Sequence, residues 1–360
     1  MARFKKRRKA TKILMIILIP LLVVLVGAAT YASYLASTAK TVVESSQHKL
    51  DSRKFDEKSE MRLEKVDPRV DNISILFLGI DDGEHKFSDR TRTDAMILAT
   101  FNEKSKSVKM VSIPRDSRVE LVGRGRMDKI THAHAYGGLD MAVNTVEKLF
   151  AIPVDYYVRL NFDAFIKIID ALGGIELDVP FDIVEQNSHR EKNKIKIKKG
   201  LQTLNGEEAL AYARTRKYDG DVERGQRQQE ILKAIIKKGL SIRSMTKYGD
   251  VIEGIGDNLT TNMTFDEMLA FHDYAYAGKN IDVEMLTLKG KPARINRLYY
   301  YLLDDTSLDE VKTKMKEHLE FDGAGGKGEN DGTQAGADGD TGSSKDDDRE
   351  TGPLNKDNDE

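Results

Sequence analysis

The sequence contains no cysteine. The protein therefore cannot form disulfides, bind a metal through thiolates, carry a lipid on cysteine or use a cysteine nucleophile. A P-loop, a nucleophile elbow and a usable serine–histidine–aspartate arrangement are also missing. Stability must come from a packed core, which a domain of this length can supply, and covalent catalysis by the protein is not indicated.

Most of the unbalanced charge of the chain lies at its two ends. The first twelve residues hold seven cations and no acid, whereas residues 321–360 hold twelve acids and four bases. The whole chain has a net charge of −2, which leaves about −1 for everything between the ends. The middle is not basic, so its arginine clusters are local features and no nucleic-acid partner is expected.

The N-terminus has the composition of a membrane anchor. An uncharged apolar run follows the basic tip 1–12 and continues, more weakly, to residue 39. Residues 13–39 are long enough to span a bilayer, and the cations predict that the tip stays in the cytoplasm. A cleaved signal peptide is the alternative, because small residues occur at 32–39. The anchor is favoured because signal cores have only about 7 to 15 apolar residues.

The rest of the chain divides by composition. Residues 40–69 are polar and highly charged, and predict a partly helical stalk outside the membrane. Residues 70–320 contain the apolar periodicity of a folded, extracytoplasmic domain. Residues 321–360 are rich in Gly and Asp, almost free of large apolar side chains, and predicted to be disordered.

Compact apolar runs alternate with amphipathic segments in the predicted domain. Buried strands are expected at 73–79, 95–101, 108–113 and 154–160. Helices are expected at 139–150, 162–172, 207–213 and from about 224 to 239; Asn205 and Glu208 form a capping-box pattern before the third. This alternation predicts an α/β fold in which helices flank a central mixed β-sheet.

Two aspartates lie where strands end. Asp81 follows the first predicted strand, and Asp94 precedes the second, after Arg92. Sites are often built at strand ends in such sheets. Two carboxylates brought together there can hold a hard cation such as Mg²⁺. Taken singly, Asp81 also fits a simple turn, and Asp94 a cap at the strand edge.

Arginines form a second group of candidates. Arg115 follows a strand and a proline in VSIPRD, and four more arginines crowd into residues 206–229 with Asp221 and Gln228. These four are Arg214, Arg216, Arg224 and Arg227. Guanidinium groups present paired donors that match phosphate oxygens, so phosphate binding is favoured over a solvated face of salt bridges.

His132 and His134 form an H-x-H pair that might suggest zinc. No third ligand is identifiable in the sequence, and a packing or helix-entry role is favoured.

In their order, downstream of one membrane helix, these segments resemble the LytR-CpsA-Psr family of bacterial cell-envelope proteins. The resemblance covers roughly residues 72–240 and rests on LFLGID, RTRTD, VSIPRD, KITHAHAYGG and ALAYARTRKYDGDVERGQRQQ. It implies that Asp81 and Asp94 bind Mg²⁺ and that Asp221 and Arg227 support the site. It also implies pyrophosphate binding by Arg92, Arg115, Arg214, Arg216, Arg224 and Gln228, with Arg92, Asp94, Arg115, Arg214 and Arg224 as the catalytic set.

The activity implied by the resemblance is magnesium-dependent phosphotransfer at the membrane. An anionic glycopolymer such as teichoic acid would move from a polyprenyl pyrophosphate carrier to peptidoglycan. A pyrophosphate hydrolase and a nonenzymatic carrier-binding or regulatory protein are the alternatives. The carrier's hydrocarbon chain needs an apolar pocket, whose candidate walls are residues 154–160, 162–172 and 175–179.

Overall fold

The computed structural model describes residues 33–34, 37–38, 40–53, 55–81, 91–217, 220–239, 258–271 and 281–322. Within these ranges no helix has both the length and the apolar character needed to cross a bilayer. The predicted tip 1–12, all but four residues of the predicted anchor 13–39, and the predicted tail beyond Asp322 lie outside the described residues.

A six-stranded mixed sheet forms the centre of the fold, in the order β11-β6-β1-β2-β3-β12. The strands are β1 (Ile73–Ile80), β2 (Thr93–Asn102), β3 (Ser107–Ser112), β6 (Tyr156–Leu160), β11 (Leu259–Thr261) and β12 (Asp282–Thr287). β2 is antiparallel to β1 and to β3, whereas β6 is parallel to β1 and β12 is parallel to β3. The predicted central mixed sheet is therefore confirmed.

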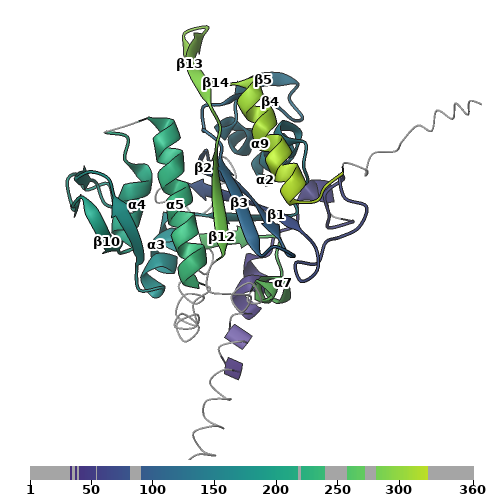
Figure 1. Ribbon diagram of the computed structural model, residues 1–360, viewed down its shortest axis with the longest axis horizontal. Helices are drawn as coiled ribbons and strands as arrows, with labels where there is room; N and C mark the ends of the chain where they lie inside the picture. Colours follow the sequence, from purple (N-terminus) through teal and green to yellow (C-terminus); the bar gives the residue numbers. More distant parts are fainter. Residues whose placement is uncertain are drawn as a thin grey trace, which may run out of the picture. The chain divides into compact units, whose positions relative to one another are not determined.

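Helices cover both faces of this sheet (Figure 1). α2 (Thr131–Phe150) and α9 (Asp305–His318) pack on one face, and α5 (Asp221–Gly239) packs on the other along β3 and β12. Because side chains alternate along each strand, every central strand contributes apolar residues to both faces of the sheet. Leu76 and Leu98 point toward α2, while Ile75 and Ala99 belong to the cluster on the α5 side.

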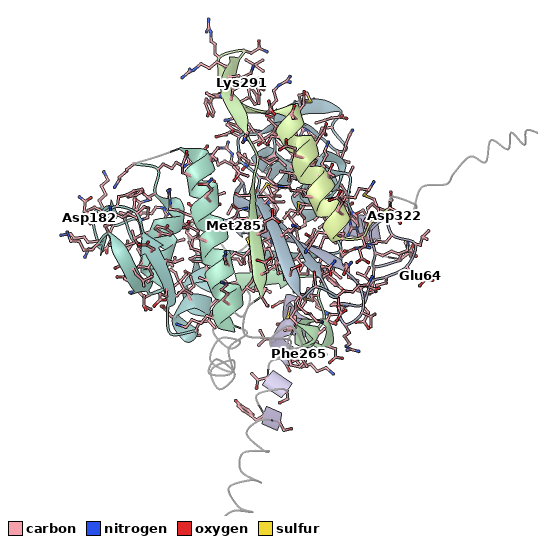
Figure 2. The ribbon with its side chains drawn as sticks, in the orientation of Figure 1. Glu64, Asp182, Phe265, Met285, Lys291 and Asp322 are labelled. Atoms are coloured by element: carbon pink, nitrogen blue, oxygen red, sulfur yellow. The ribbon has the colours of Figure 1, made fainter. Side chains whose placement is uncertain are left out.

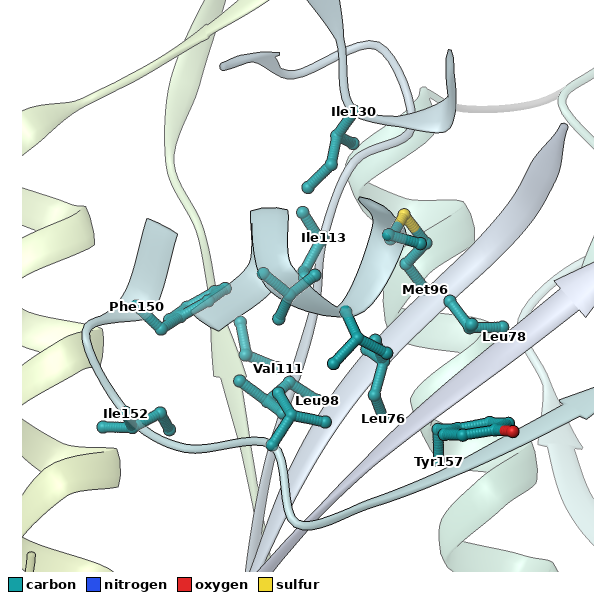
Figure 3. Close-up of a cluster of buried hydrophobic side chains, with 14 of the residues drawn as sticks. Leu76, Leu78, Met96, Leu98, Val111, Ile113, Ile130, Phe150, Ile152 and Tyr157 are labelled. Carbon is teal, nitrogen blue, oxygen red and sulfur yellow. The ribbon is translucent and has the colours of Figure 1, made fainter. Parts of the chain in front are cut away.

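The core under α2 is the larger of these two clusters. Figure 3 shows Leu76, Leu78, Met96 and Leu98 from the central strands in one cluster with Phe150, the last residue of α2, and Ile152, which follows the helix. Each of these six side chains is at most 1 % exposed. Burial on this scale stabilises by roughly 1.5–3 kcal/mol for each large side chain, so β1 and β2 are held firmly in register.

A smaller group of elements, called here the helical lobe, packs beside the sheet through α5. It consists of α3 (Phe162–Ala171), α4 (Gly206–Arg214), the β7–β10 pair (Ile175–Val179 and Gly200–Leu204) and the β8–β9 hairpin (Ile183–Glu185 and Ile195–Ile197). Its core joins Ile169, Tyr212 and Ile231. The capping box predicted from Asn205 and Glu208 is present at the start of α4.

Two further hairpins lie at the edge where β3 and β12 end. They are β4–β5 (Arg118–Leu121 and Arg126–Lys129) and β13–β14 (Gly290–Ile295 and Leu298–Leu303), linked by an isolated bridge between Ser117 and Tyr301. Lys291 marks the projecting β13–β14 hairpin in Figure 2. The remaining short elements are η1 (Asp51–Arg53) and α7 (Phe265–Ala270).

The segment 40–69, expected as a stalk, is helical only near its start and then packs on the domain. Leu50 is 2 % exposed and joins the core under α2, and the Arg53 guanidinium lies 2.7 Å from Glu147. Arg62 pairs with Asp155 at 2.7 Å. The high charge suggested a solvated spacer, but several of these charges are neutralised by acids of the domain, so the folded unit begins near Gln47 rather than at residue 70.

α2 begins at Thr131, eight residues before the predicted start. Gly137 and Gly138 have non-helical backbone angles, with φ of +61° at Gly138. The chain resumes the helix after this kink. The residues from Thr131 to Tyr136, which precede the predicted helix, therefore form its first turns. α5 likewise begins at Asp221, three residues earlier than predicted.

A buried histidine makes the stability of this fold sensitive to acid. His318 accepts or donates hydrogen bonds of 2.8 Å with Thr100 and Ser107, and its burial lowers its pKa from 6.5 to about 4. Between these pH values the unfolded chain binds a proton that the folded state excludes. Stability is therefore lost as pH falls from 6.5 to 4.

We predict that this effect contributes about 3 kcal/mol to acid destabilisation. In a His318→Gln variant, the unfolding free energy, measured with urea at several pH values, should fall less steeply over that interval. His48→Gln is the control, because His48 is exposed. Equal pH slopes for wild type and His318→Gln would contradict the assignment.

Candidate functional site

The ends of β1, β3 and β6 and the start of β2 lie at the same edge of the sheet. The segments at the first three of these strands in chain order carry predicted site residues. Because β2 is antiparallel to both its neighbours, its start lies beside the ends of β1 and β3. Gly79 pairs with Ala95, and Ile97 pairs with Ser112. Asp81, Asp94 and Arg115 therefore meet at this edge, as the sequence predicted. The end of β6 joins them because β6 runs parallel to β1.

The first turn of α2 fixes the two chain segments that carry Asp94 and Arg115. The Thr131 amide donates to the Arg115 carbonyl at 3.2 Å, and its hydroxyl donates to the Thr93 carbonyl at 2.7 Å. His134 Nδ1 donates to the Thr91 carbonyl at 2.8 Å, while its Nε2 lies 3.3 Å from Arg159. His132 instead contacts Asp128. The two histidines face different partners, so the positioning role expected for them is confirmed.

α4 and α5 bring the arginine cluster to the same edge. A Cβ at Gly225 would lie 2.6 Å from Ser112 Oγ, so glycine is what allows α5 to approach the end of β3 this closely. Arg224, the preceding residue, is consequently 5 % exposed. Arg214 at the end of α4 has its guanidinium 4.7 Å from the Phe162 ring centre, which is a cation–π distance.

Carboxylates neutralise this cluster only in part. Arg115 donates a hydrogen bond to Asp94, while Asp221 lies 3.4 Å from Arg216 and 3.3 Å from Arg224. Burial raises the pKa of Asp94, with Asp81 adding to the effect and Arg115 opposing it. Burial also raises the pKa of Asp221, assisted by Asp116 and opposed by Arg216. Negative charge on either aspartate is thus balanced by the arginines beside it.

Several arginine donors at the site lack a hydrogen-bond partner in the described part of the chain. Arg115 Nε, Arg214 Nη1 and Arg224 Nε are all buried in this way. A buried donor without a partner costs about 1–3 kcal/mol, and more when it is charged. Such a cost is tolerated where a ligand supplies the acceptors. Three guanidinium groups with open donors at one place indicate an anion with several oxygens, such as a phosphate group.

An apolar cavity of about 510 Å³ opens at the charged cluster. It runs between the β1 and β2 face of the sheet and the helices of the lobe. Its polar end includes Asp81, Asp94, Arg214, Arg216, Lys217, Arg224, Gln228 and Glu185. Its apolar walls include Phe77, Ile97, Leu160, Phe162, Phe165, Leu210, Ile231, Leu232 and Ile235. A ligand for this cavity has an anionic head and a long apolar tail.

The two predicted metal ligands are close enough for Asp81 to raise the pKa of Asp94. Two carboxylates beside a phosphate site fit Mg²⁺, which takes its other ligands from water and substrate oxygens. Within the described residues no group of three or more histidine or acidic side chains is arranged to hold a metal alone. The donor set thus fits a cation that is shared with a phosphate-bearing substrate.

Not every predicted residue lies at the cavity. Arg92, which is exposed, Arg115 and Asp221 are not among the residues that line the cavity. Arg115 is linked to the lining through its hydrogen bond to Asp94. Arg227 is buried and donates to the Tyr212 and Thr215 carbonyls at 3.1 and 2.5 Å. It supports the α4–α5 connection, consistent with a supporting role.

The predicted walls of the pocket were right only in part. Leu160, Phe162 and Phe165 line the cavity, but residues 175–179 do not, because they form β7 inside the lobe. Sequence reasoning also missed three polar residues at the mouth. Glu185 and Lys217 pair with each other at 3.4 Å, and Arg190 lies 3.4 Å from Asp81. Glu185 and Arg190 lie outside the recognised motifs, and Lys217 lies inside the last of them but was not singled out.

Fold and site together define an α/β protein with an apolar cavity, bounded by the sheet and neighbouring helices, that has arginines at one end. Comparison with known proteins agrees: residues 32–317 match the LytR_cpsA_psr family model, and the chain belongs to this family. One relative, from Bacillus subtilis (strain 168), is the polyisoprenyl-teichoic acid–peptidoglycan teichoic acid transferase TagT. It is 43 % identical over 266 residues, which cover 73 % of this chain and 82 % of TagT.

Solved structures of this relative superpose on the chain. TagT bound to LIIa-WTA has a TM-score of 0.64 at 41 % identity, covering 73 % of this chain and 96 % of the solved one. YwtF (TagT) with bound octaprenyl pyrophosphate lipid has a TM-score of 0.60 at 38 % identity, covering 73 % and 97 %. The fold is therefore that of a family whose members have been solved with lipid-linked ligands.

We predict that the arginines of the α4–α5 region differ sharply in their contribution to stability. Arg227→Met leaves the buried carbonyls of Tyr212 and Thr215 without a donor and should cost about 2–4 kcal/mol. Arg216→Met should cost less than about 1 kcal/mol, because this side chain is 45 % exposed and makes only a long ion pair. Urea unfolding of both variants measures the difference, and equal losses would refute this division.

Proposed function

We propose that this protein is a phosphotransferase that moves an anionic glycopolymer from a polyprenyl pyrophosphate carrier to peptidoglycan. The relative named above, TagT, carries that activity in its name and has been solved with octaprenyl pyrophosphate. The observation that carries the proposal is the joining of open arginine donors to an apolar cavity. The donors suit the pyrophosphate, and the cavity suits the polyprenyl chain.

In the proposed reaction an acceptor hydroxyl of peptidoglycan attacks the phosphorus on the sugar side of the pyrophosphate. A new oxygen–phosphorus bond forms, the bond to the bridging oxygen breaks, and polyprenyl phosphate leaves. Arg214 and Arg224, with Gln228 on the same wall, hold the phosphate oxygens from the lobe side, and Arg115 does so from the end of β3. Charge that develops on these oxygens meets donors already in place, so no protein nucleophile is required.

Asp94 and Asp221 have different parts in this scheme. Asp221 orients Arg216 and Arg224, which it contacts directly. Asp94 lies at the cavity mouth beside Asp81, and its raised pKa suits a group that accepts the proton of the attacking hydroxyl. Asp81 and Asp94 would also hold Mg²⁺, which when bound neutralises the pyrophosphate charge.

The proposed substrate places the protein at the outer face of the membrane. A polyprenyl chain is soluble only in lipid, so an enzyme that binds it benefits from attachment to the same bilayer. The apolar run 13–39 is proposed as that attachment, with the basic tip 1–12 in the cytoplasm. The domain would then meet both its lipid-linked donor and the peptidoglycan acceptor outside the cell.

Product analysis tests the proposed activity. Full-length protein in nanodiscs is incubated with a lipid-pyrophosphate-linked saccharide and peptidoglycan oligomers, with Mg²⁺ or with a chelator. The products are identified by mass spectrometry. We expect a phosphodiester-linked glycan only with Mg²⁺, and Asp81→Asn should need more Mg²⁺ for half-maximal rate. Free saccharide phosphate despite abundant acceptor would support a hydrolase instead, and tightly bound but unchanged substrate would support a carrier-binding protein.

Loss of one open donor should damage the reaction without unfolding the protein. We predict that Arg214→Gln lowers the transfer rate by roughly a hundredfold to a thousandfold, as for other donors that stabilise developing charge. Its melting temperature should fall only slightly, because Arg214 Nη1 has no hydrogen-bond partner to lose within the described residues and the cation–π contact with Phe162 is worth about 0.5–2 kcal/mol. Arg69→Gln, an exposed arginine away from the cavity, is the matched control. Wild-type transfer by Arg214→Gln would remove this residue from the site.

A further inference from the structure

The β8–β9 hairpin has a charge unlike that of the domain that carries it. Residues 189–199 contain one arginine and five lysines but only one acid, whereas the chain between its charged ends has a net charge of about −1. Lysine alternates with isoleucine through β9, so Ile195 and Ile197 turn inward and the lysines turn outward. Four exposed lysines of this segment are called here the lysine row: Lys192, Lys194, Lys196 and Lys198.

Acids of the same hairpin do not neutralise the whole row. Lys198 pairs with Asp182 at 2.8 Å and Lys194 with Glu191 at 3.6 Å. Lys192 and Lys196 have no ion pair with any acid in the described ranges. Asp182, labelled in Figure 2, marks the outer side of the lobe, where this hairpin meets solvent. The row is therefore an exposed surface with uncompensated positive charge.

The same hairpin reaches the mouth of the cavity at two points. Arg190, in its turn, lies 3.4 Å from Asp81, and Glu185, at the end of β8, both lines the cavity and pairs with Lys217. Lys217 also donates to the Val184 carbonyl. The lysine row thus begins where the pyrophosphate would be held and continues away from it along the lobe.

We infer that the lysine row binds the phosphodiester chain of the polymer attached to the carrier, and so makes the enzyme prefer polyanionic polymers over neutral glycans. This inference rests on the proposed function. Alternate side chains on a strand recur about every 6.6 Å, so one extended polyanion can contact Lys194, Lys196 and Lys198, in and beside β9, in turn. Lys192 lies in the turn that precedes this strand. Each exposed contact is worth little alone, but contacts to one chain act together, and their strength falls with added salt.

The test compares two lipid-pyrophosphate-linked substrates that share one disaccharide. One ends at the disaccharide, and the other is extended by a short chain of glycerol phosphate units. In the variant Lys192→Gln/Lys194→Gln/Lys196→Gln, we expect the KM of the extended substrate to rise roughly tenfold, from about a factor of two for each exposed charge. The KM of the short substrate and both kcat values should not change. The wild-type preference for the extended substrate should also weaken as salt is added.

A matched control neutralises three lysines on the opposite side of the sheet, Lys312→Gln/Lys314→Gln/Lys316→Gln on α9, and should leave both KM values unchanged. Equal KM values for the row variant and wild type would overturn the inference, as would equal rises for both substrates. A variant that loses only its sedimentation with phosphatidylglycerol vesicles would also overturn it, because the row would then contact the membrane. If wild type transfers neither substrate, the proposed function itself has failed.

Discussion

The antiparallel pairing of β2 with both β1 and β3 is the constraint on which the site depends. It places the start of one strand beside the ends of two others, and the parallel β6 adds a fourth end. Asp81, Asp94 and Arg115 come from the ends of three consecutive strands, and strand register brings them together. The deeply buried side chains on both faces of the sheet hold this register, because a slip by one residue would exchange the side chains that face α2 with those that face α5.

The charged cluster contains more arginine donors than its carboxylates accept from. Asp94 and Asp221 compensate some of the arginine charge, but Arg115 Nε, Arg214 Nη1 and Arg224 Nε lack a hydrogen-bond partner among the described residues. Each buried donor without a partner costs free energy, which supports the proposal that a ligand supplies the acceptors. Arg227, which makes two carbonyl hydrogen bonds, shows how an arginine of the same region is satisfied when its role is structural. The contrast separates binding arginines from supporting ones.

The cavity combines an apolar environment and a charged environment in one site. Its walls of Phe, Leu and Ile come from β1, β2, α3, α4 and α5, and they meet the arginines at one end. The proposed ligand, a polyprenyl pyrophosphate, has the same division between tail and head. In the proposed scheme the basic hairpin at the mouth contacts a third part of the substrate, the polymer. Burial of the tail, ion pairing of the head and salt-sensitive contacts to the chain are physically independent.

Local patterns in the sequence determined the β-strands, the capping box of Asn205 and Glu208, and the residue types suited to phosphate, because these depend on periodicity and near neighbours. The family resemblance added the expectation that Asp81, Asp94 and the arginines act together. Only the tertiary structure decided that residues 175–179 leave the cavity wall and that Arg190 and Lys217 reach its mouth. It also turned the expected stalk into part of the domain, since Arg53 and Arg62 find their acids about ninety residues away. Strand register and long-range ion pairing set these features, and neither is written in any single segment of the chain.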